Sequence, residues 1–167
     1  MIRFAYLIAF GGNLGNREEF ARKSLLHLMS SGQVGRQSAW HLTPPLPSSV
    51  YRVDDHQDYL NFVFEYFTEH PPSQVYQIVR SIEDTYGHDR SQRWRPRAVD
   101  LDLLFCAECD HAAPCFDLSR QVAYQHADED LVIPHPDIWN RRFLLDMIEN
   151  ELGLAVSSCR TRMNHGQ

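Results

Sequence analysis

The order in which strand-like and helix-like segments follow one another constrains the fold of this chain more than any other feature. Alternation of apolar and polar side chains indicates a strand, and a spacing of three or four residues indicates a helix. In chain order the pattern predicts a strand at 4–10, a helix at 16–29, a strand at about 33–42, a strand at 59–68, a helix at 72–86 and a strand from Val99. Asn16 can cap the first helix. The apolar face of this helix is expected to consist of Ala21, Leu25, Leu28 and Met29.

This order, β-α-β-β-α-β, is that of the ferredoxin-like split βαβ sandwich. We therefore expect an α+β fold in which an antiparallel sheet carries helices on one face, with C-terminal additions. The additions are a short strand at 131–133 and a helix at 140–150. The sequence predicts a single domain at 1–150, with an irregular insertion at about 106–129, and a C-terminal tail at 151–167. Many functions share this topology, so it identifies no activity.

Two aspartates on the strand from Val99 point to metal chemistry. Side chains alternate along a strand, so Asp100 and Asp102 share one face, and Val99, Leu101, Leu103 and Phe105 share the other. Side chains two residues apart on a strand are separated by roughly 7 Å. At this separation two hard oxygen ligands can share one Mg²⁺ or flank a pair of ions.

A loop rich in arginine leads directly into this strand. Its basic residues are Arg90, Arg93, Arg95 and Arg97. Guanidinium groups offer forked donors that suit phosphate oxygens, and a divalent metal beside such groups recurs in phosphoryl transfer. The residues alone leave the alternative open that arginines and aspartates form an ion-pair network at a sheet edge.

Charge and composition limit the classes of partner. A net charge of −6 argues against a general nucleic-acid binder, and the chain lacks the aromatic motif of ferredoxin-like RNA-binding domains. We find no targeting segment and no apolar run long enough to span a membrane, so we expect a cytoplasmic protein. In that compartment the four cysteines are expected to be reduced. A monomer is expected, with small molecules as partners.

Six short motifs occur in order between about residues 4 and 148. The most specific is Arg93-Trp94-x-Pro96-Arg97-x-x-Asp100-Leu101-Asp102. The others are Ala9 to Gly15, Thr43 to Leu46, Asp58 to Asn61, Ile82-Glu83 with Gly87, and Ile133 to Pro136 with Arg141 and Phe143. Together they resemble the 6-hydroxymethyl-7,8-dihydropterin pyrophosphokinase family of folate biosynthesis.

The resemblance implies an enzyme that transfers pyrophosphate from ATP to the hydroxymethyl group of the reduced pterin and releases AMP. Implied as catalytic are Arg90, Arg97, Asp100 and Asp102, the two aspartates as ligands of two Mg²⁺ ions. Implied as nucleotide-binding are Glu83, Arg90, Trp94, Arg97, His135 and Arg141. Implied as pterin-binding are Thr43, Pro45, Leu46, Tyr59, Asn61 and Phe143, with Tyr59 and Phe143 sandwiching the pterin ring.

Several of these side chains also have ordinary structural explanations. Tyr59 and Phe143 could be core aromatics, and Asn61 could satisfy a turn. His135 could face solvent in its loop, and Glu83 could lie on the solvated face of a helix. These alternatives stay open at the level of the sequence.

The chain departs from the family pattern in two regions. Gly12 replaces a serine, His88 replaces an arginine and Arg95 replaces a glycine, which leaves open a diverged paralogue that binds ATP or a pterin without efficient transfer. The segment 106–129 is longer than usual. Its Cys106, Cys109 and Cys115, with His111 nearby, could hold a structural Zn²⁺, with free thiols as the alternative.

Overall fold

A computed structural model describes residues 3–45, 57–87, 91, 96–110, 114–126 and 130–157. The longer elements are β1 (Phe4–Gly12), α1 (Arg17–Met29), β2 (Gln33–Gln37), β4 (Tyr59–Thr68), α2 (Pro72–Thr85) and β5 (Asp100–Glu108). The shorter strands are β3 (His41–Thr43), β6 (Gln121–Val122), β7 (Tyr124–Gln125) and β8 (Val132–Ile133). The remaining helical segments are η1 (Leu118–Arg120), η2 (Ile138–Asn140), α3 (Arg142–Asp146) and η3 (Met147–Glu151).

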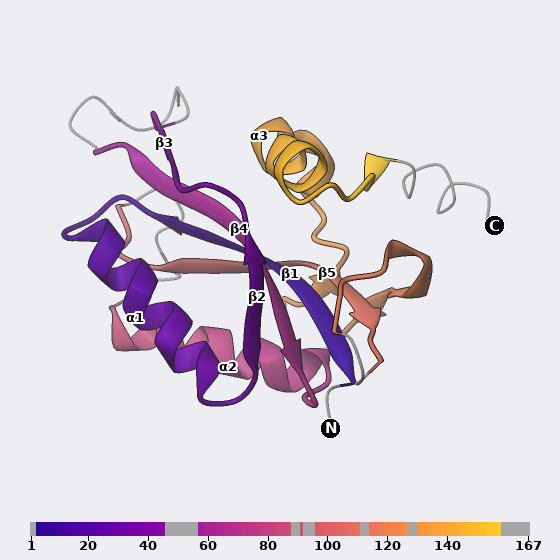
Figure 1. The fold of residues 1–167 in the computed structure, drawn as a ribbon. Helices are drawn as coiled ribbons and strands as arrows, with labels where there is room; N and C mark the ends of the chain where they lie inside the picture. The colour runs from indigo at the N-terminus through magenta and orange to yellow at the C-terminus, as the bar shows by residue number, and fades with distance from the viewer. Residues whose placement is uncertain are drawn as a thin grey trace.

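The main sheet is antiparallel and has the strand order β2-β4-β1-β5-β6, with β3 also paired to β4 (Figure 1). The predicted α+β class with an antiparallel sheet is confirmed. The single strand expected at 33–42 is wrong, because the chain leaves β2 and resumes as β3. Between them Ser38 bonds to Val63 twice, through its backbone N–H and its side-chain oxygen.

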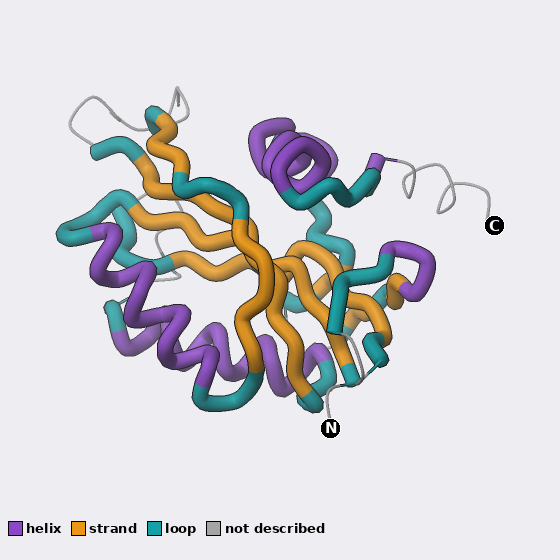
Figure 2. The backbone as a smooth tube through the Cα atoms, in the orientation of Figure 1, coloured by secondary structure: helices purple, strands orange, loops and turns teal. Residues whose placement is uncertain are grey.

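Both faces of the sheet are buried. Tyr6, Ile8 and Phe10 of β1 pack in a cluster with residues of α1 and α2, which we call the α1/α2 side. Ala5 and Leu7 pack in a second cluster with residues of α3 and η3, which we call the α3 side. Figures 1 and 2 show the sheet between these two layers of helix. The C-terminal additions therefore cover the face that the predicted pair of helices leaves open.

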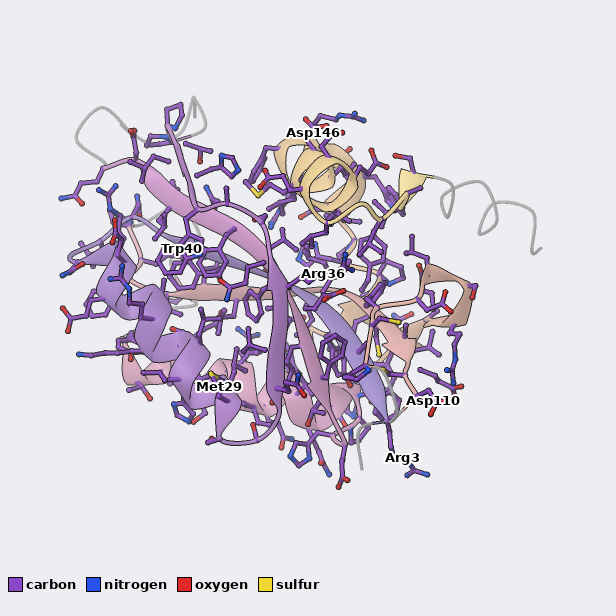
Figure 3. The ribbon with its side chains drawn as sticks, viewed as in Figure 1. Arg3, Met29, Arg36, Trp40, Asp110 and Asp146 are labelled. Atoms are coloured by element: carbon purple, nitrogen blue, oxygen red, sulfur yellow. The ribbon has the colours of Figure 1, made fainter. Side chains whose placement is uncertain are left out.

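Helix α1 begins and ends close to its predicted limits. The Asn16 side chain accepts a hydrogen bond from the Glu19 N–H at 3.2 Å, which confirms the predicted cap. The predicted apolar face is partly wrong, because Ser24 is buried while Met29, at the end of the helix in Figure 3, is 56% exposed. The Ser24 hydroxyl is satisfied within the helix by the Phe20 carbonyl at 2.8 Å, which makes its burial inexpensive.

Strand β5 contains a β-bulge that the sequence does not reveal. Leu7 pairs with Phe105 but Ile8 pairs with Leu103, so Leu104 is an extra residue. The alternation of side chains reverses at this point, and Phe105 packs on the α3 side with Leu7. The prediction that Phe105 shares a face with Leu103 is therefore wrong.

Candidate active site

The candidate site lies on the α3 side, where β4, β1 and β5 run next to one another. Gly11 of β1 pairs with Asn61 on one side and with Asp100 on the other. A Cβ atom at Gly11 would lie 3.3 Å from Asn61 Oδ1 and 4.0 Å from Asp100 Cβ. The glycine therefore leaves room for an amide and a carboxylate to face each other across the central strand.

Asp102 pairs with Ala9, which lies two residues from Gly11 on β1. Both aspartates therefore project on the α3 side. The Arg97 guanidinium donates to Asp100 Oδ2 at 3.1 Å, and the Arg141 guanidinium donates to Asp102 Oδ2. The two carboxylate side chains are 29% and 24% exposed. They are thus held by cations yet open to a ligand from solvent.

His135 completes the surroundings of Asp102. Its backbone N–H donates to the carbonyl of the bulge residue Leu104 at 2.9 Å, and the Nε2 atom of its ring lies 3.7 Å from Asp102 Oδ1. Its Nδ1 accepts from the Asp137 N–H at 3.2 Å, so the neutral ring carries its proton on Nε2, toward Asp102. Burial lowers the pKa of His135, an effect that the neighbouring Asp102 opposes. His135 is a constituent of the site and not a solvent-facing loop residue.

Arg97 is positioned by Asn13, which stands out in the sequence only as part of the motif Ala9 to Gly15. The Arg97 N–H donates to Asn13 Oδ1 at 2.9 Å, and the Asn13 N–H donates to the Arg97 carbonyl at 2.9 Å. Asn13 is 1% exposed. Its location directly after a strand and two glycines is the signal that could have marked it.

Gly12 lies against the same segment. A Cβ atom at Gly12 would lie 2.3 Å from the Ala98 carbonyl oxygen, closer than such atoms come in proteins. In this chain the glycine that replaces the family's serine is therefore required by the approach of the loop before β5.

Gly12→Ala is expected to lower the free energy of unfolding by about 2 kcal/mol, because the added methyl group overpacks a backbone contact. It should also lower kcat, since relief of the clash moves the segment that holds Arg97. Urea unfolding and steady-state kinetics measure the two effects. Wild-type stability in this variant would contradict the close approach of Ala98.

Glu83 of α2 hydrogen-bonds to the backbone of β5 from the α1/α2 side. Its side chain is 3% exposed, and its Oε1 accepts from the Leu101 N–H at 2.9 Å. β6 pairs with β5 only at Cys106 and Ala107, so it does not reach this amide. Glu83 is not on a solvated face as the alternative supposed, and it fixes the backbone between the two aspartates. Its contact with a nucleotide stays a prediction.

The pterin side of the predicted site is formed by β3 and β4. Thr43 pairs with Tyr59, and Asn61 donates through Nδ2 to Thr43 Oγ1 at 2.5 Å. Tyr59 and Pro45 are half-buried, and burial raises the pKa of Tyr59. Phe143 of α3 is partly buried against the α3-side cluster. The predicted site residues Leu46, Arg90 and Trp94, with the departures His88 and Arg95, lie outside the described residues.

The cysteines expected to bind zinc lie on opposite sides of the sheet. Cys106 packs on the α1/α2 side beside Tyr6, where burial raises the pKa of its thiol to about 12. Cys109 packs on the α3 side, and Cys115 is an exposed free thiol. Within the described ranges there is no group of three or more His, Cys, Asp or Glu residues that could hold a metal ion. The zinc prediction thus gains no support here, and His111, which belonged to it, lies outside the described residues.

The site places two carboxylates on one strand of an α+β fold, and each carboxylate is paired with an arginine. Sites of this kind are found in proteins that bind nucleotide phosphates together with a divalent metal. Over residues 7–150 the chain matches the family described as 7,8-dihydro-6-hydroxymethylpterin-pyrophosphokinase (HPPK). The chain belongs to this family.

Curated relatives agree with the family match. The chain is 31% identical over 147 residues to 2-amino-4-hydroxy-6-hydroxymethyldihydropteridine pyrophosphokinase of Bacillus subtilis, covering 87% of this chain and 75% of the relative. The protein of the same name from Methylorubrum extorquens is 30% identical, with 84% and 77% covered. A folate synthesis bifunctional protein of Chlamydia trachomatis is 30% identical, over 91% of this chain but only 32% of that longer protein.

No helix in the described part of the chain combines the length and the hydropathy that a membrane crossing needs.

Proposed function

We propose that the chain transfers pyrophosphate from ATP to the hydroxymethyl group of 6-hydroxymethyl-7,8-dihydropterin at this site, giving AMP and the pterin diphosphate of folate biosynthesis. The observation that carries the assignment to this site is the row Asn61, Gly11, Asp100 across the sheet. A pterin held at Asn61 would have its hydroxymethyl group beside phosphates held at Asp100. Placing two reactants side by side supplies much of the rate enhancement in such a transfer.

Asp100 and Asp102 are proposed to hold Mg²⁺ together with phosphate oxygens of ATP, with two ions expected from the family resemblance. Mg²⁺ is commonly bound by one or two carboxylates plus substrate phosphates, so a third protein ligand is not required. Hard carboxylate oxygens that are partly exposed fit this ion. When bound, Mg²⁺ neutralises charge on the phosphates.

The chain's own cations are proposed to bind the phosphates. Arg97 and Arg141 each give a donor to a carboxylate, and a guanidinium group carries five N–H donors in all. The forked geometry of these donors suits the oxygens of a phosphate. The hydroxymethyl oxygen attacks the β-phosphorus, the bond from that phosphorus to the α,β-bridging oxygen breaks, and AMP leaves with that oxygen. Arg97 and Arg141 stabilise the charge that develops on the phosphates.

The fold and its extent are proposed in the same terms. The order β2-β4-β1-β5, with α1 and α2 on one face, supports a ferredoxin-like core. A single catalytic domain over 1–150 is supported by the family match over residues 7–150.

The test is to measure AMP release from ATP and Mg²⁺, with and without 6-hydroxymethyl-7,8-dihydropterin. The expected result is one AMP for each pterin diphosphate formed, and no AMP with 6-methyl-7,8-dihydropterin, which lacks the accepting hydroxyl. Release of ADP, or AMP release that does not depend on the pterin, would refute the proposal. ATP or pterin binding without turnover would identify the diverged paralogue instead.

A further inference from the structure

The turn that ends the C-terminal helical segment, which consists of α3 and η3, is attached to the stretch of chain from β2 to β3. Glu151 Oε2 accepts from the Ala39 N–H at 2.6 Å, and Glu151 Oε1 lies 2.6 Å from His41 Nε2. The next residue, Leu152, accepts from the Arg36 guanidinium through its carbonyl at 2.9 Å. These contacts join residues more than 100 positions apart in the sequence.

Arg36 is a fixed attachment point, because Glu65 in the middle of the sheet holds it. Glu65 is 2% exposed and accepts from Arg36 Nε at 3.1 Å, from Nη2 at 2.6 Å and from the Arg36 backbone N–H at 3.1 Å. Figure 3 shows Arg36 between β2 and the C-terminal helical segment. The position of the η3 turn relative to the sheet is therefore set by this carboxylate.

The shape of η3 directs Glu151 and the Leu152 carbonyl toward the sheet. The segment Met147–Glu151 is a π-helix, and the Leu152 N–H donates to the Met147 carbonyl at 3.2 Å, five residues back. Such wide turns in proteins often lie at functional sites. The α-helix α3 directly precedes this turn, and Arg141 is its N-cap. The attachment thus links β3 to the helical segment whose N-cap is Arg141.

Strand β3 is short, and the attachment holds its first residue. It contains only His41, Leu42 and Thr43, and it pairs with β4 at those three residues. A strand this short at an edge has little stability of its own. Its last residue, Thr43, accepts the hydrogen bond from Asn61 Nδ2 and so fixes the orientation of the Asn61 amide.

We propose that Glu151 is a positioning residue for the pterin half of the active site. Through Ala39 and His41 it holds β3 where Thr43 can orient Asn61. Within the described residues Glu151 is hydrogen-bonded to Ala39 and His41 and not directly to Thr43 or Asn61, so its influence passes through β3. The inference rests on the proposed function, because it assigns Asn61 to pterin binding.

The experiment compares wild type with Glu151→Ala, Glu151→Gln and Glu149→Ala. Glu149 is the matched control, because it lies on the same turn but accepts from Ser157. We expect Glu151→Ala to raise KM for the pterin by about fivefold, the effect of losing charge-assisted hydrogen bonds at a partly exposed site, and to change KM for ATP less than twofold. Glu151→Gln keeps an acceptor for Ala39 and should recover part of the loss. Glu149→Ala should match wild type.

Amide hydrogen exchange supplies a readout that does not require turnover. Residues 39–43 should exchange faster in Glu151→Ala than in wild type, and at the wild-type rate in Glu149→Ala. Unchanged exchange and an unchanged pterin KM would overturn the proposal, as would equal rises in both KM values. If the wild type released no pterin-dependent AMP, the proposed function would fail, and the exchange experiment would still show whether Glu151 holds β3.

Discussion

Asp100→Ala and Asp102→Ala are each expected to lower kcat by about 10³-fold, the usual scale for removing a group that stabilises charge in a transfer reaction. Both carboxylates lie on the α3 side of β5 and are partly exposed, as ligands for a metal bound with ATP must be. Rapid-quench measurement of AMP formation under saturating ATP and pterin would separate this loss from weakened binding.

The two variants should differ in how tightly they bind ATP in the absence of Mg²⁺. Asp100→Ala removes the carboxylate that Arg97 contacts, whereas Asp102→Ala removes the carboxylate shared by Arg141 and His135. We expect both variants to bind Mg²⁺-free ATP more tightly than wild type, because each removes one negative charge from the site, and we expect the gain to be larger for Asp102→Ala, whose carboxylate faces both Arg141 and His135. Calorimetric titration with ATP in EDTA and in Mg²⁺ tests this.

Asp117→Ala is a suitable control for both, since that carboxylate caps η1 by accepting from the Ser119 N–H at 2.8 Å. Wild-type kcat is expected in this control. If either site variant kept a tenth of the wild-type kcat with the same Mg²⁺ dependence, β5 would not carry the metal ligands.

Glu65→Ala is expected to lower the free energy of unfolding by about 2 kcal/mol, which is the scale for leaving buried polar groups without their hydrogen-bond partner. Glu65 is 2% exposed and accepts from the Arg36 side chain and backbone, and its Oε1 also accepts from the Phe116 N–H at 3.4 Å. Its removal leaves these donors without their acceptor. Urea unfolding followed by circular dichroism measures the change.

Glu18→Ala provides the matched comparison. Glu18 pairs with Arg22 at 2.9 Å, but both side chains are 63% exposed. Such a pair is worth about 0.5 kcal/mol or less in water. Equal losses of stability in Glu18→Ala and Glu65→Ala would contradict a structural role for the buried carboxylate. Arg36→Ala should be nearly as costly as Glu65→Ala, because it strands a buried charge.

Local patterns in the sequence predicted most of the elements well. The strand Tyr59–Thr68 has the predicted limits, and α2 ends where Gly87 adopts a φ of 72°. The cap at Asn16 is also confirmed. These features depend on residues that are close together in the sequence, so a local sequence pattern is enough to predict them.

Features that depend on contacts between distant segments escaped prediction. The extra residue Leu104 is detectable only against its partner strand β1, so the alternation at Phe105 was misassigned. Strand β1 is apolar at successive positions, which indicates that both of its faces are buried. No local pattern indicates which segment packs on the α3 side.

Much of the candidate site was predicted by residue type and family resemblance, while its arrangement was not. Asp100, Asp102, Arg97, His135 and Arg141 are brought together as a group. The pairing of Asn61 and Asp100 with Gly11 depends on the register of three strands. The roles of Asn13 and Glu83 as supports likewise follow from backbone amides that become available only in the folded chain.

The bulge at Leu104 allows one strand to serve two environments with opposite parity. Before it, even-numbered residues line the substrate-facing surface; after it, Phe105 and Ala107 take that side as core. If Leu104 were kept but paired in a regular ladder, one half of the strand would shift by one position and bring a carboxylate or a core aromatic to the wrong layer, whereas deleting Leu104 would leave the other side chains on their present sides. By absorbing Leu104, the bulge keeps both carboxylates, Phe105 and Ala107 on the α3 side although their sequence positions differ in parity.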